Sequence, residues 1–239
     1  MKGYEARIRV CVLKDFNSKY VYSKLAEFIN FSMNKDDVLK KMHRGNGFKG
    51  YCFSGLSPFE RTTYTEGDVY DFYIRSFDKG LLERFINVFR NLENEFMMTI
   101  DTEFIERSHE CLIDSIFTTT PAVVTIRDDK SNDSPWIVGV ENELLENAIV
   151  NNLVKKFNSV NGTNLYVDKN DIIERVDVCN KYPVKIPYKN ISFLGNILEI
   201  KFKDNPIAQN LANTAYFLGV CTRNSSLGCG FTKANYRKR

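Results

Sequence analysis

The sequence contains two histidines, and one of them is followed closely by a lysine. His43 precedes Lys49 by six residues. A histidine has a pKa of about 6.5 and can take or give a proton near neutral pH, while a lysine can stabilise negative charge that builds up in a transition state. The pair therefore indicates proton transfer next to a positive charge. His109 stands in the stretch 106–110, between two predicted domains, where we expect a surface position, and two distant histidines make no metal site.

A polar segment flanked by glycines lies near the C-terminus. Residues 219–231 read GVCTRNSSLGCGF. Glycine adopts backbone conformations that other residues resist, and it lets a ligand approach the main chain, whose N–H groups can bind phosphate. Arg223 adds a positive charge to this segment. The competing interpretation is a plain connection between a helix and a strand.

This segment resembles the glycine-rich loop of the CRISPR-associated endoribonucleases that process repeat RNA, the Cas-six family. The family's loop has Gly-hydrophobic-Gly, a polar stretch and a second Gly-hydrophobic-Gly, and Gly219, Gly228 and Gly230 match it. Cys221 stands in place of the second glycine, so we expect a more conventional backbone in the first half of the loop. Residues 42–56, MHRGNGFKGYCFSGL, resemble the family's His, Gly-Phe-Lys and Phe-Ser stretch.

The resemblance implies a metal-independent endoribonuclease that cuts CRISPR repeat RNA (pre-crRNA). RNA carries its own nucleophile, the 2′-hydroxyl, so the implied reaction needs no cofactor and yields a 2′,3′-cyclic phosphate and a 5′-hydroxyl. His43 is the implied proton-transfer group and Lys49 the implied electrostatic one. A tyrosine often completes the family's set, and Tyr20 and Tyr22 are both candidates. The competing interpretation is that His43 only ends a helix, stabilised by the helix dipole and followed by Gly45 as a cap.

The implied RNA contacts come from the loop and from nearby basic residues. These are Arg44, Gly219, Arg223, Asn224, Ser225, Ser226, Gly228, Gly230 and Lys233. The expected partners are CRISPR repeat RNA and proteins of a CRISPR effector complex, and a homodimer is left open. Two other functions also remain open: a catalytically inactive subunit that retains crRNA in such a complex, and a ferredoxin-like pair of ligand-binding or regulatory domains.

The elements that must position these residues follow from the apolar periodicity of the first half of the chain. Strand-like alternation and helical spacing predict, in order, a strand at 5–13, helices at 19–31 and 36–42, strands at 48–53 and 68–74, a helix at 81–89 and a strand at 98–105. The order β-α-β-β-α-β is that of the ferredoxin-like unit, in which two helices cover one face of a four-stranded antiparallel sheet.

A second copy of this order follows in the other half of the chain. The predicted elements are strands at 112–126 and 137–140, a helix at 141–160, strands at 172–179, 184–188 and 197–202, and a helix at 206–218 that Pro206 opens. Residues 128–135 are predicted to form a turn or a short loop. We therefore expect an α+β protein of two tandem ferredoxin-like domains, residues 1–108 with His43 and residues 109–239 with the glycine-rich loop.

Composition agrees with such a protein. A chain of 239 residues suits two domains of ordinary size, and a net charge of +3 permits RNA binding without requiring it. No apolar run approaches the ~20 residues of a membrane-spanning helix, and the N-terminus lacks the apolar core of a signal peptide. The six cysteines include no Cys-x-x-Cys pair. We expect a cytoplasmic protein with reduced thiols and no metal centre.

Overall fold

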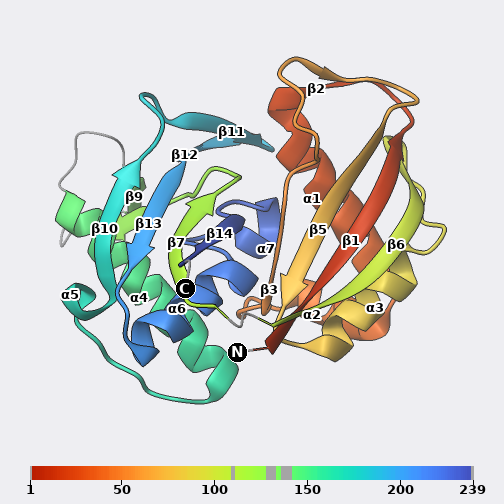
Figure 1. Cartoon of the computed structure of the whole chain (residues 1–239). Coiled ribbons are helices and arrows are strands. Elements are labelled where there is room, and N and C mark those ends of the chain that lie inside the picture. Colours follow the sequence, from red (N-terminus) through yellow and green to blue (C-terminus); the bar gives the residue numbers. More distant parts are fainter. Residues whose placement is uncertain (1, 109–110, 128–132, 136–141, 238–239) are drawn as a thin grey trace.

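The computed structural model describes residues 2–108, 111–127, 133–135 and 142–237 of the chain. These residues form two halves that lie side by side, each built on a four-stranded antiparallel sheet (Figure 1). The first sheet is made by residues up to Ser108 and the second begins at Ile113.

The first half follows the β-α-β-β-α-β order. Its elements are β1 (Lys2–Val12), α1 (Val21–Met33), α2 (Asp37–Arg44), β3 (Tyr51–Phe53), β5 (Val69–Ser76), α3 (Lys79–Phe89) and β6 (Met97–Ser108). The strands lie in the order β3-β5-β1-β6, so the first and third strands of the unit are central. Two short elements precede α1: strand β2 (Phe16–Asn17) and a 3-10 turn (Ser18–Tyr20). Strand β2 pairs with β4 (Thr63–Tyr64) in a small separate sheet.

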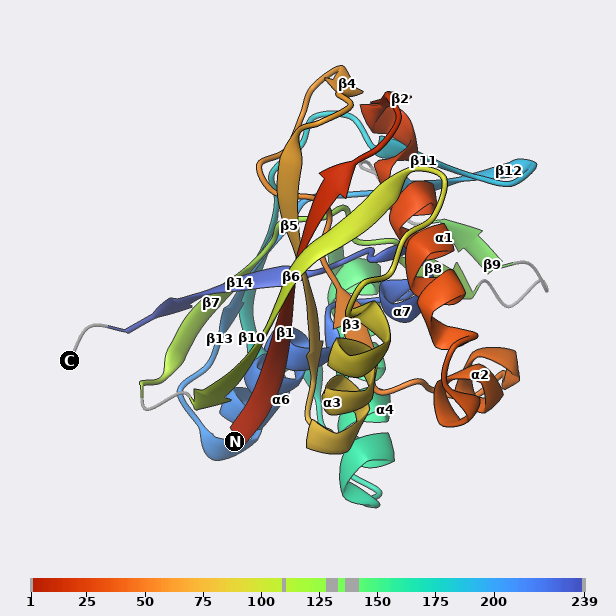
Figure 2. The same cartoon turned by 90° about the vertical axis from the view of Figure 1, so that its right-hand side faces the viewer.

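The core of the first half lies between the sheet and its helices, which Figure 2 shows on one side of β1, β5 and β6. Alternate residues of β1, such as Ile8 and Val10, are fully buried, as the period of two in its sequence requires. Leu25 of α1 and Phe85 of α3 are buried in the same cluster. The spacing of apolar residues on each element therefore decides which face turns inward.

The second half repeats the same topology. Its main elements are β7 (Ile113–Thr118), α4 (Asn142–Asn161), β10 (Ile173–Val178), β13 (Leu198–Phe202), α6 (Pro206–Leu218) and β14 (Thr232–Tyr236), with the sheet order β10-β13-β7-β14. Smaller elements are α5 (Lys169–Ile172), the pair β8 (Thr125–Arg127) and β9 (Asp133–Pro135), the hairpin β11 (Val184–Tyr188) and β12 (Ile191–Gly195), and α7 (Asn224–Leu227). Two tandem ferredoxin-like units, the predicted fold class, are confirmed.

The structure differs from the sequence-based expectations in several small elements. Residues 133–135, predicted to lie in a loop, form β9 and pair with β8. Five short elements were not predicted: β2, β4, α5, β12 and the single helical turn α7. Helix α6 begins at Pro206 as predicted, because the Asn205 side chain accepts a hydrogen bond from the backbone N–H of Ala208. The predicted strand 137–140, the loop residues 128–132 and His109 lie outside the described residues.

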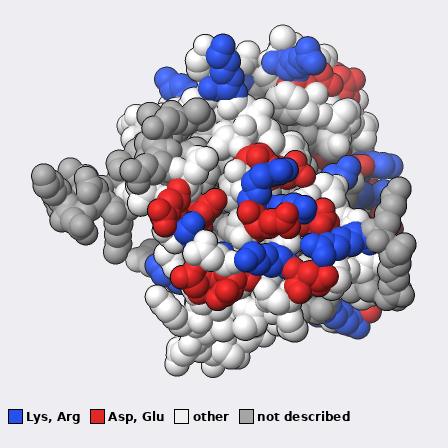
Figure 3. Space-filling model, turned by 60° about the vertical axis from the view of Figure 1, so that its left-hand side comes forward, with Lys and Arg blue, Asp and Glu red and all other residues white. Residues whose placement is uncertain are grey.

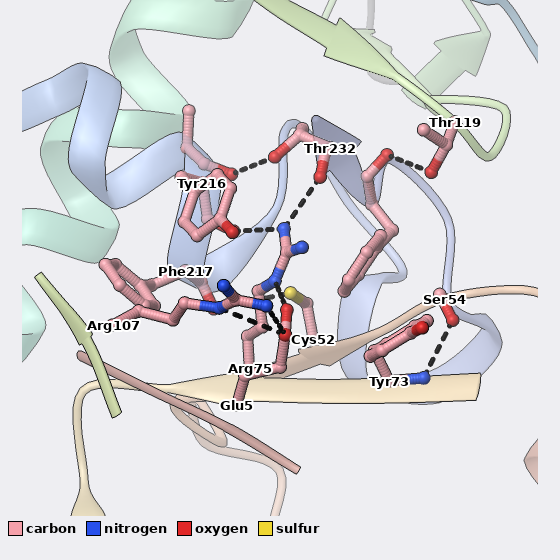
Figure 4. A network of polar contacts seen from close by, with 12 residues as sticks. Glu5, Cys52, Ser54, Tyr73, Arg75, Arg107, Thr119, Tyr216, Phe217 and Thr232 are labelled. Carbon is pink, nitrogen blue, oxygen red and sulfur yellow. Dashed lines mark hydrogen bonds and ion pairs between the residues drawn. The ribbon is translucent and has the colours of Figure 1, made fainter. Parts of the chain in front are cut away.

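A buried arginine joins the two halves (Figure 4). Arg75 of β5 donates from Nε to Glu5 Oε2 at 2.6 Å, and its Nη1 donates to the backbone oxygen of Thr232, in the second half, at 2.7 Å. Its guanidinium also lies over the rings of Tyr216 and Phe231, 3.9 and 4.2 Å from their centroids. Burial alone would raise the pKa of Glu5, but Arg75 and Arg107 outweigh it and lower the pKa.

Two segments of the second half reach the helices of the first. The β11–β12 hairpin lies beside α1 and the turn before it, and α7 lies against α1 and β3 (Figures 1 and 2). Tyr51 of β3 donates its hydroxyl proton to the backbone oxygen of Ser225 in α7, 3.0 Å away. The N-terminal helices, the hairpin and the glycine-rich loop are therefore neighbours although they lie far apart in the sequence.

Candidate functional site

His43 stands in the last turn of α2. Asp36 caps the start of the helix: its Oδ1 accepts hydrogen bonds from the N–H groups of Val38 and Leu39, both at 2.9 Å. It ends where Gly45 takes an extended conformation. His43 is partly buried and lines a cavity of about 470 Å³.

The surroundings of His43 favour its neutral form. Burial lowers the pKa of the imidazole below its usual value, and the positive charges of Lys49 and Arg44 lower it further. The Nδ1 atom is buried and has no hydrogen-bond partner among the described residues. Nε2 is therefore the ring nitrogen through which His43 can take a proton from a substrate.

The two candidate tyrosines face different cavities. Tyr20, which ends the 3-10 turn before α1, is exposed and lines the same cavity as His43. Tyr22 lines a second cavity, of about 320 Å³, between the two halves of the chain, together with Arg75 and Phe231. Burial raises the pKa of the Tyr22 hydroxyl above its usual range. The sequence left this choice open, and the structure places only Tyr20 beside His43.

Lys49 is near His43 but does not share its cavity. Its Nζ donates to the backbone oxygen of His43 at 3.0 Å, and the side chain lines a separate cavity of about 590 Å³ with Phe48 and Arg84. Burial lowers the pKa of Lys49. The lysine thus holds the end of α2 and acts on the imidazole through its charge.

The cavity of His43 is also lined by residues that the sequence did not single out. Tyr188 and Lys189, at the tip of the β11–β12 hairpin, line the cavity together with Lys24 of α1. Lys24 is also paired with Glu27, at 3.1 Å. Its spacing of four residues from Tyr20 could have placed it on the same side of α1, but no local signal in the sequence brings the hairpin to this cavity.

The glycine-rich loop has an unusual backbone throughout. Gly219, Gly228 and Gly230 have φ of 71, 66 and 64°, and a Cβ on Gly228 would lie 2.6 Å from the ring of Phe53. Cys221 also has a positive φ, 61°. The expectation of a more conventional backbone in the first half of the loop is therefore wrong: Cys221 keeps the left-handed conformation that favours a glycine.

A buried lysine on α4 holds the loop in this shape. Lys156 Nζ donates to the backbone oxygens of Gly219 and Cys221 at 2.7 and 3.0 Å and to Asn224 Oδ1 at 2.7 Å. Burial lowers the pKa of Lys156 to about 8, which leaves it mainly protonated at neutral pH. Nδ2 of Asn224 donates to the backbone oxygens of Val220 and Cys229. The side chain of Asn224, a predicted RNA contact, is thus buried and occupied within the loop.

Other predicted RNA contacts remain accessible. Arg223 is exposed and lies over the ring of Phe193, 4.7 Å from its centroid. With Ser225 and Ser226, which are partly buried, it lines a groove of about 740 Å³ against Lys155 and other residues of α4. Gly219, Gly228 and Gly230 are themselves buried.

The remaining two predicted RNA contacts, Arg44 and Lys233, are exposed and lie apart from this groove. Arg44 is next to His43, while Lys233 lines the cavity between the two halves. The predicted contacts therefore do not form one surface. On the face drawn in Figure 3, basic and acidic side chains outside the grey atoms are interspersed, so that face offers no extended positive surface for a polyanion.

Comparison with known proteins supports the fold. No family model and no curated protein matches the sequence. Among solved structures, one titled as a CRISPR-associated protein Cas6 aligns with a TM-score of 0.73 and 16% identity, covering 98% of this chain and 99% of its own. The chain has the Cas6 fold.

Two further structures with this fold were found. A RAMP protein binding different RNA substrates aligns with a TM-score of 0.71 and 17% identity, covering 97% of this chain and 99% of its own. A Cas6-related protein from Pyrococcus furiosus aligns with a TM-score of 0.67 and 18% identity, covering 99% and 100%. The Cas6 fold thus extends over nearly the whole chain.

Within residues 2–108, 111–127, 133–135 and 142–237, no three His, Cys, Asp or Glu side chains are placed to hold a metal ion. The helices of this part of the chain are too short or too polar to span a membrane.

Proposed function

We propose that the protein is a Cas6-family endoribonuclease that cuts CRISPR repeat RNA without a metal ion. The observation that carries the proposal is the shared cavity of His43 and Tyr20, with Lys24 and Lys189 on its walls. A neutral histidine, a tyrosine hydroxyl and the ammonium group of Lys189 are suited to a phosphodiester that reacts with its own 2′-hydroxyl, whereas the charge of Lys24 is paired with Glu27. The Cas6 fold and the match of the glycine-rich loop to that family's pattern support the substrate class.

In this mechanism His43 is the general base. Its Nε2 takes the proton of the 2′-hydroxyl as the 2′-oxygen bonds to phosphorus, and the bond from phosphorus to the 5′-oxygen breaks. The 5′-oxygen leaves with a proton from water, and the products are a 2′,3′-cyclic phosphate and a 5′-hydroxyl. Tyr20 donates a hydrogen bond to a phosphate oxygen, and Lys189 stabilises the negative charge that builds up there. Lys49 keeps His43 in place and in its neutral form.

The test is cleavage of repeat RNA from the host array in EDTA, by the wild type and by matched variants. We expect His43→Ala to lower the rate by about 10²- to 10⁴-fold, the usual contribution of a general base. Tyr20→Phe should lower the rate, whereas Tyr22→Phe should not, because Tyr22 faces the other cavity. A 2′-deoxy substitution at the scissile nucleotide should abolish cleavage. Cleavage that needs a divalent ion, or that survives His43→Ala unchanged, would refute the mechanism.

A second candidate is a subunit that binds crRNA without cutting it. Lys49 favours this function, because it lines a cavity other than that of His43 and so offers no direct contact to a phosphate held there. Tight binding of intact repeat RNA by the wild type, with no cleavage over hours, would support it. Absence of binding would exclude both functions.

A further inference from the structure

Lys156 stands out because it is a buried lysine without a carboxylate partner among the described residues. Its side chain is 6% exposed, and Nζ donates to four oxygen atoms at 2.7 to 3.3 Å. Burying an ammonium group costs free energy unless its N–H groups find hydrogen-bond acceptors. The contacts of Lys156 must therefore offset the free energy of its desolvation. All four oxygens belong to Leu218, at the end of α6, or to the glycine-rich loop that follows it.

The position of these oxygens explains how the charge is tolerated. The backbone oxygens of Leu218 and Gly219 end α6, a helix of 13 residues, and the C-terminal end of a helix carries partial negative charge. Lys156 therefore satisfies carbonyl groups that the end of the helix leaves without intrahelical partners. The same ammonium group binds the backbone oxygen of Cys221, a residue with a positive φ of 61°.

The contacts of Lys156 continue into the part of the loop that faces solvent. Asn224, which accepts from Nζ, is the first residue of α7 and donates to Val220 and Cys229 on either side of the loop. Arg223 comes directly before it, with φ of 64°, and is exposed. Lys156 on α4 is thus hydrogen-bonded to Asn224, and the residue before Asn224 is Arg223, which lines the groove against α4.

We propose that Lys156 is a positioning residue for RNA binding: it holds the glycine-rich loop in the conformation that presents Arg223 to the substrate. The proposal rests on the RNA-binding part of the proposed function but not on cleavage. Because Lys156 does not line the cavity of His43, its loss should weaken RNA binding and leave the chemical step intact.

The first test is RNA affinity, measured with repeat RNA in a His43→Ala background so that the RNA stays whole. Lys156→Met keeps the apolar stem and removes the charge and its donors. We expect it to weaken binding by about 10- to 100-fold, as for the loss of the charged hydrogen bonds that Arg223 would make to the RNA. Lys169→Met is the matched control, since Lys169 is held by Glu146 at 2.5 Å and lies away from the loop. It should leave the affinity unchanged.

A double-mutant cycle separates positioning from general loss of stability. If Lys156 acts through Arg223, then Arg223→Ala weakens binding in the wild type but has little further effect in Lys156→Met. Equal losses in both backgrounds would overturn the proposal, as would an unchanged affinity in folded Lys156→Met. With His43 restored, the single-turnover cleavage rate of Lys156→Met at saturating RNA should stay within about threefold of the wild type.

Hydrogen exchange tests the loop without RNA. The amides of Val220, Leu227 and Gly230 donate hydrogen bonds within or beside the loop, and we expect them to exchange faster in Lys156→Met but not in Lys169→Met. Unchanged protection would refute the proposal whatever the RNA affinity of the wild type. Absence of RNA binding by the wild type would instead overturn both the proposed function and the role of Lys156 in RNA binding. If Lys156→Met does not fold, Asn224→Ala should show the same faster exchange, because it removes one acceptor of Nζ and the two hydrogen bonds that Asn224 Nδ2 donates within the loop.

Discussion

Nζ of Lys49 donates a hydrogen bond to the backbone oxygen of His43, 3.0 Å away. The two residues that the sequence suggested as a catalytic pair are thus in contact, but through the main chain of the histidine. The lysine satisfies a carbonyl group in the last turn of α2 and places a positive charge near the imidazole. We therefore expect Lys49 to affect catalysis by holding His43 in place and by lowering its pKa.

Removing Lys49 should raise the pKa of His43. In Lys49→Met a cation that lowers this pKa is lost, so His43 stays protonated to a higher pH and cannot act as a base there. The acid limb of the pH–rate profile should move to higher pH. The pKa can be measured from the imidazole resonances, with His109 as an internal reference. Lys41→Met, on the same helix, is the control, and an unchanged or lower pKa in Lys49→Met would contradict the prediction.

The buried pair of Arg75 and Glu5 should be far more important for stability than an exposed pair on the same two strands. Glu5 and Arg75 are cross-strand neighbours on β1 and β5, as are Arg9 and Asp71, but only the first pair is buried. Arg75→Met should lower the free energy of unfolding by about 3 to 5 kcal/mol, because it removes one partner of a buried ion pair.

Arg9→Met, the control for this prediction, should cost at most about 1 kcal/mol. Urea unfolding measures both variants. Glu5→Gln combined with Arg75→Met should recover part of the loss, since the carboxylate is then no longer buried as a charge. Equal losses of unfolding free energy for Arg75→Met and Arg9→Met would argue that Arg75 does not stabilise the contact between the two halves.

Gly228 should tolerate alanine much less than Gly162. Both have a positive φ, 66 and 63°, but a Cβ on Gly228 would meet the ring and the backbone oxygen of Phe53 at 2.6 and 2.8 Å, whereas nothing lies within 4 Å of one on Gly162. Gly162→Ala should cost about 1 to 2 kcal/mol for the backbone alone, and Gly228→Ala about 2 to 4 kcal/mol because overpacking is added. Thermal or urea unfolding compares them, and similar costs would show that the loop can move away from β3.

The protein should lose stability above about pH 9. Burial raises the pKa of Cys52, Cys221 and Cys229 to about 12 each, so these thiols stay protonated in the folded state while they ionise in the unfolded chain. Each contributes stability that is present below the unfolded pKa and lost as pH rises, by about 1.4 kcal/mol per pH unit. Lys156 has the opposite effect, because burial lowers its pKa to about 8. Between pH 8 and its unfolded-state pKa of 10.5, it raises the free energy of unfolding by about 1.4 kcal/mol per pH unit.

The net fall should be about 2 to 3 kcal/mol per pH unit just above pH 9. Urea unfolding under reducing conditions at pH 8, 9 and 10 measures it. Cys229→Ala should reduce this net slope by about half, because it removes one of three thiol contributions while that of Lys156 stays, and Cys111→Ala, at an exposed position, serves as the control. A free energy of unfolding that stays constant from pH 8 to 10 would count against the burial of these thiols.

The sequence by itself determined the succession of the main elements. The alternation in 5–13, the helical spacing in 19–31 and the proline at 206 each depend on neighbours a few residues away, so β1, α1 and α6 could be predicted from local patterns. The repeated order then gave the fold, because few topologies accommodate two β-α-β-β-α-β units. Residue types, together with the resemblance to the Cas-six family, identified His43 and the glycine-rich loop as candidates.

Only the tertiary structure decided which side chains share a site. Tyr20 and Tyr22 are two residues apart in the sequence, and their cavities differ because Tyr20 ends a 3-10 turn while Tyr22 belongs to α1 and points between the halves. Lys189 reaches the cavity of His43 through a hairpin from the other half. The backbone oxygen of Cys221, a residue with positive φ, accepts a hydrogen bond from Lys156, 65 residues earlier in the chain. Such relations depend on contacts between distant segments, which propensity and periodicity do not encode.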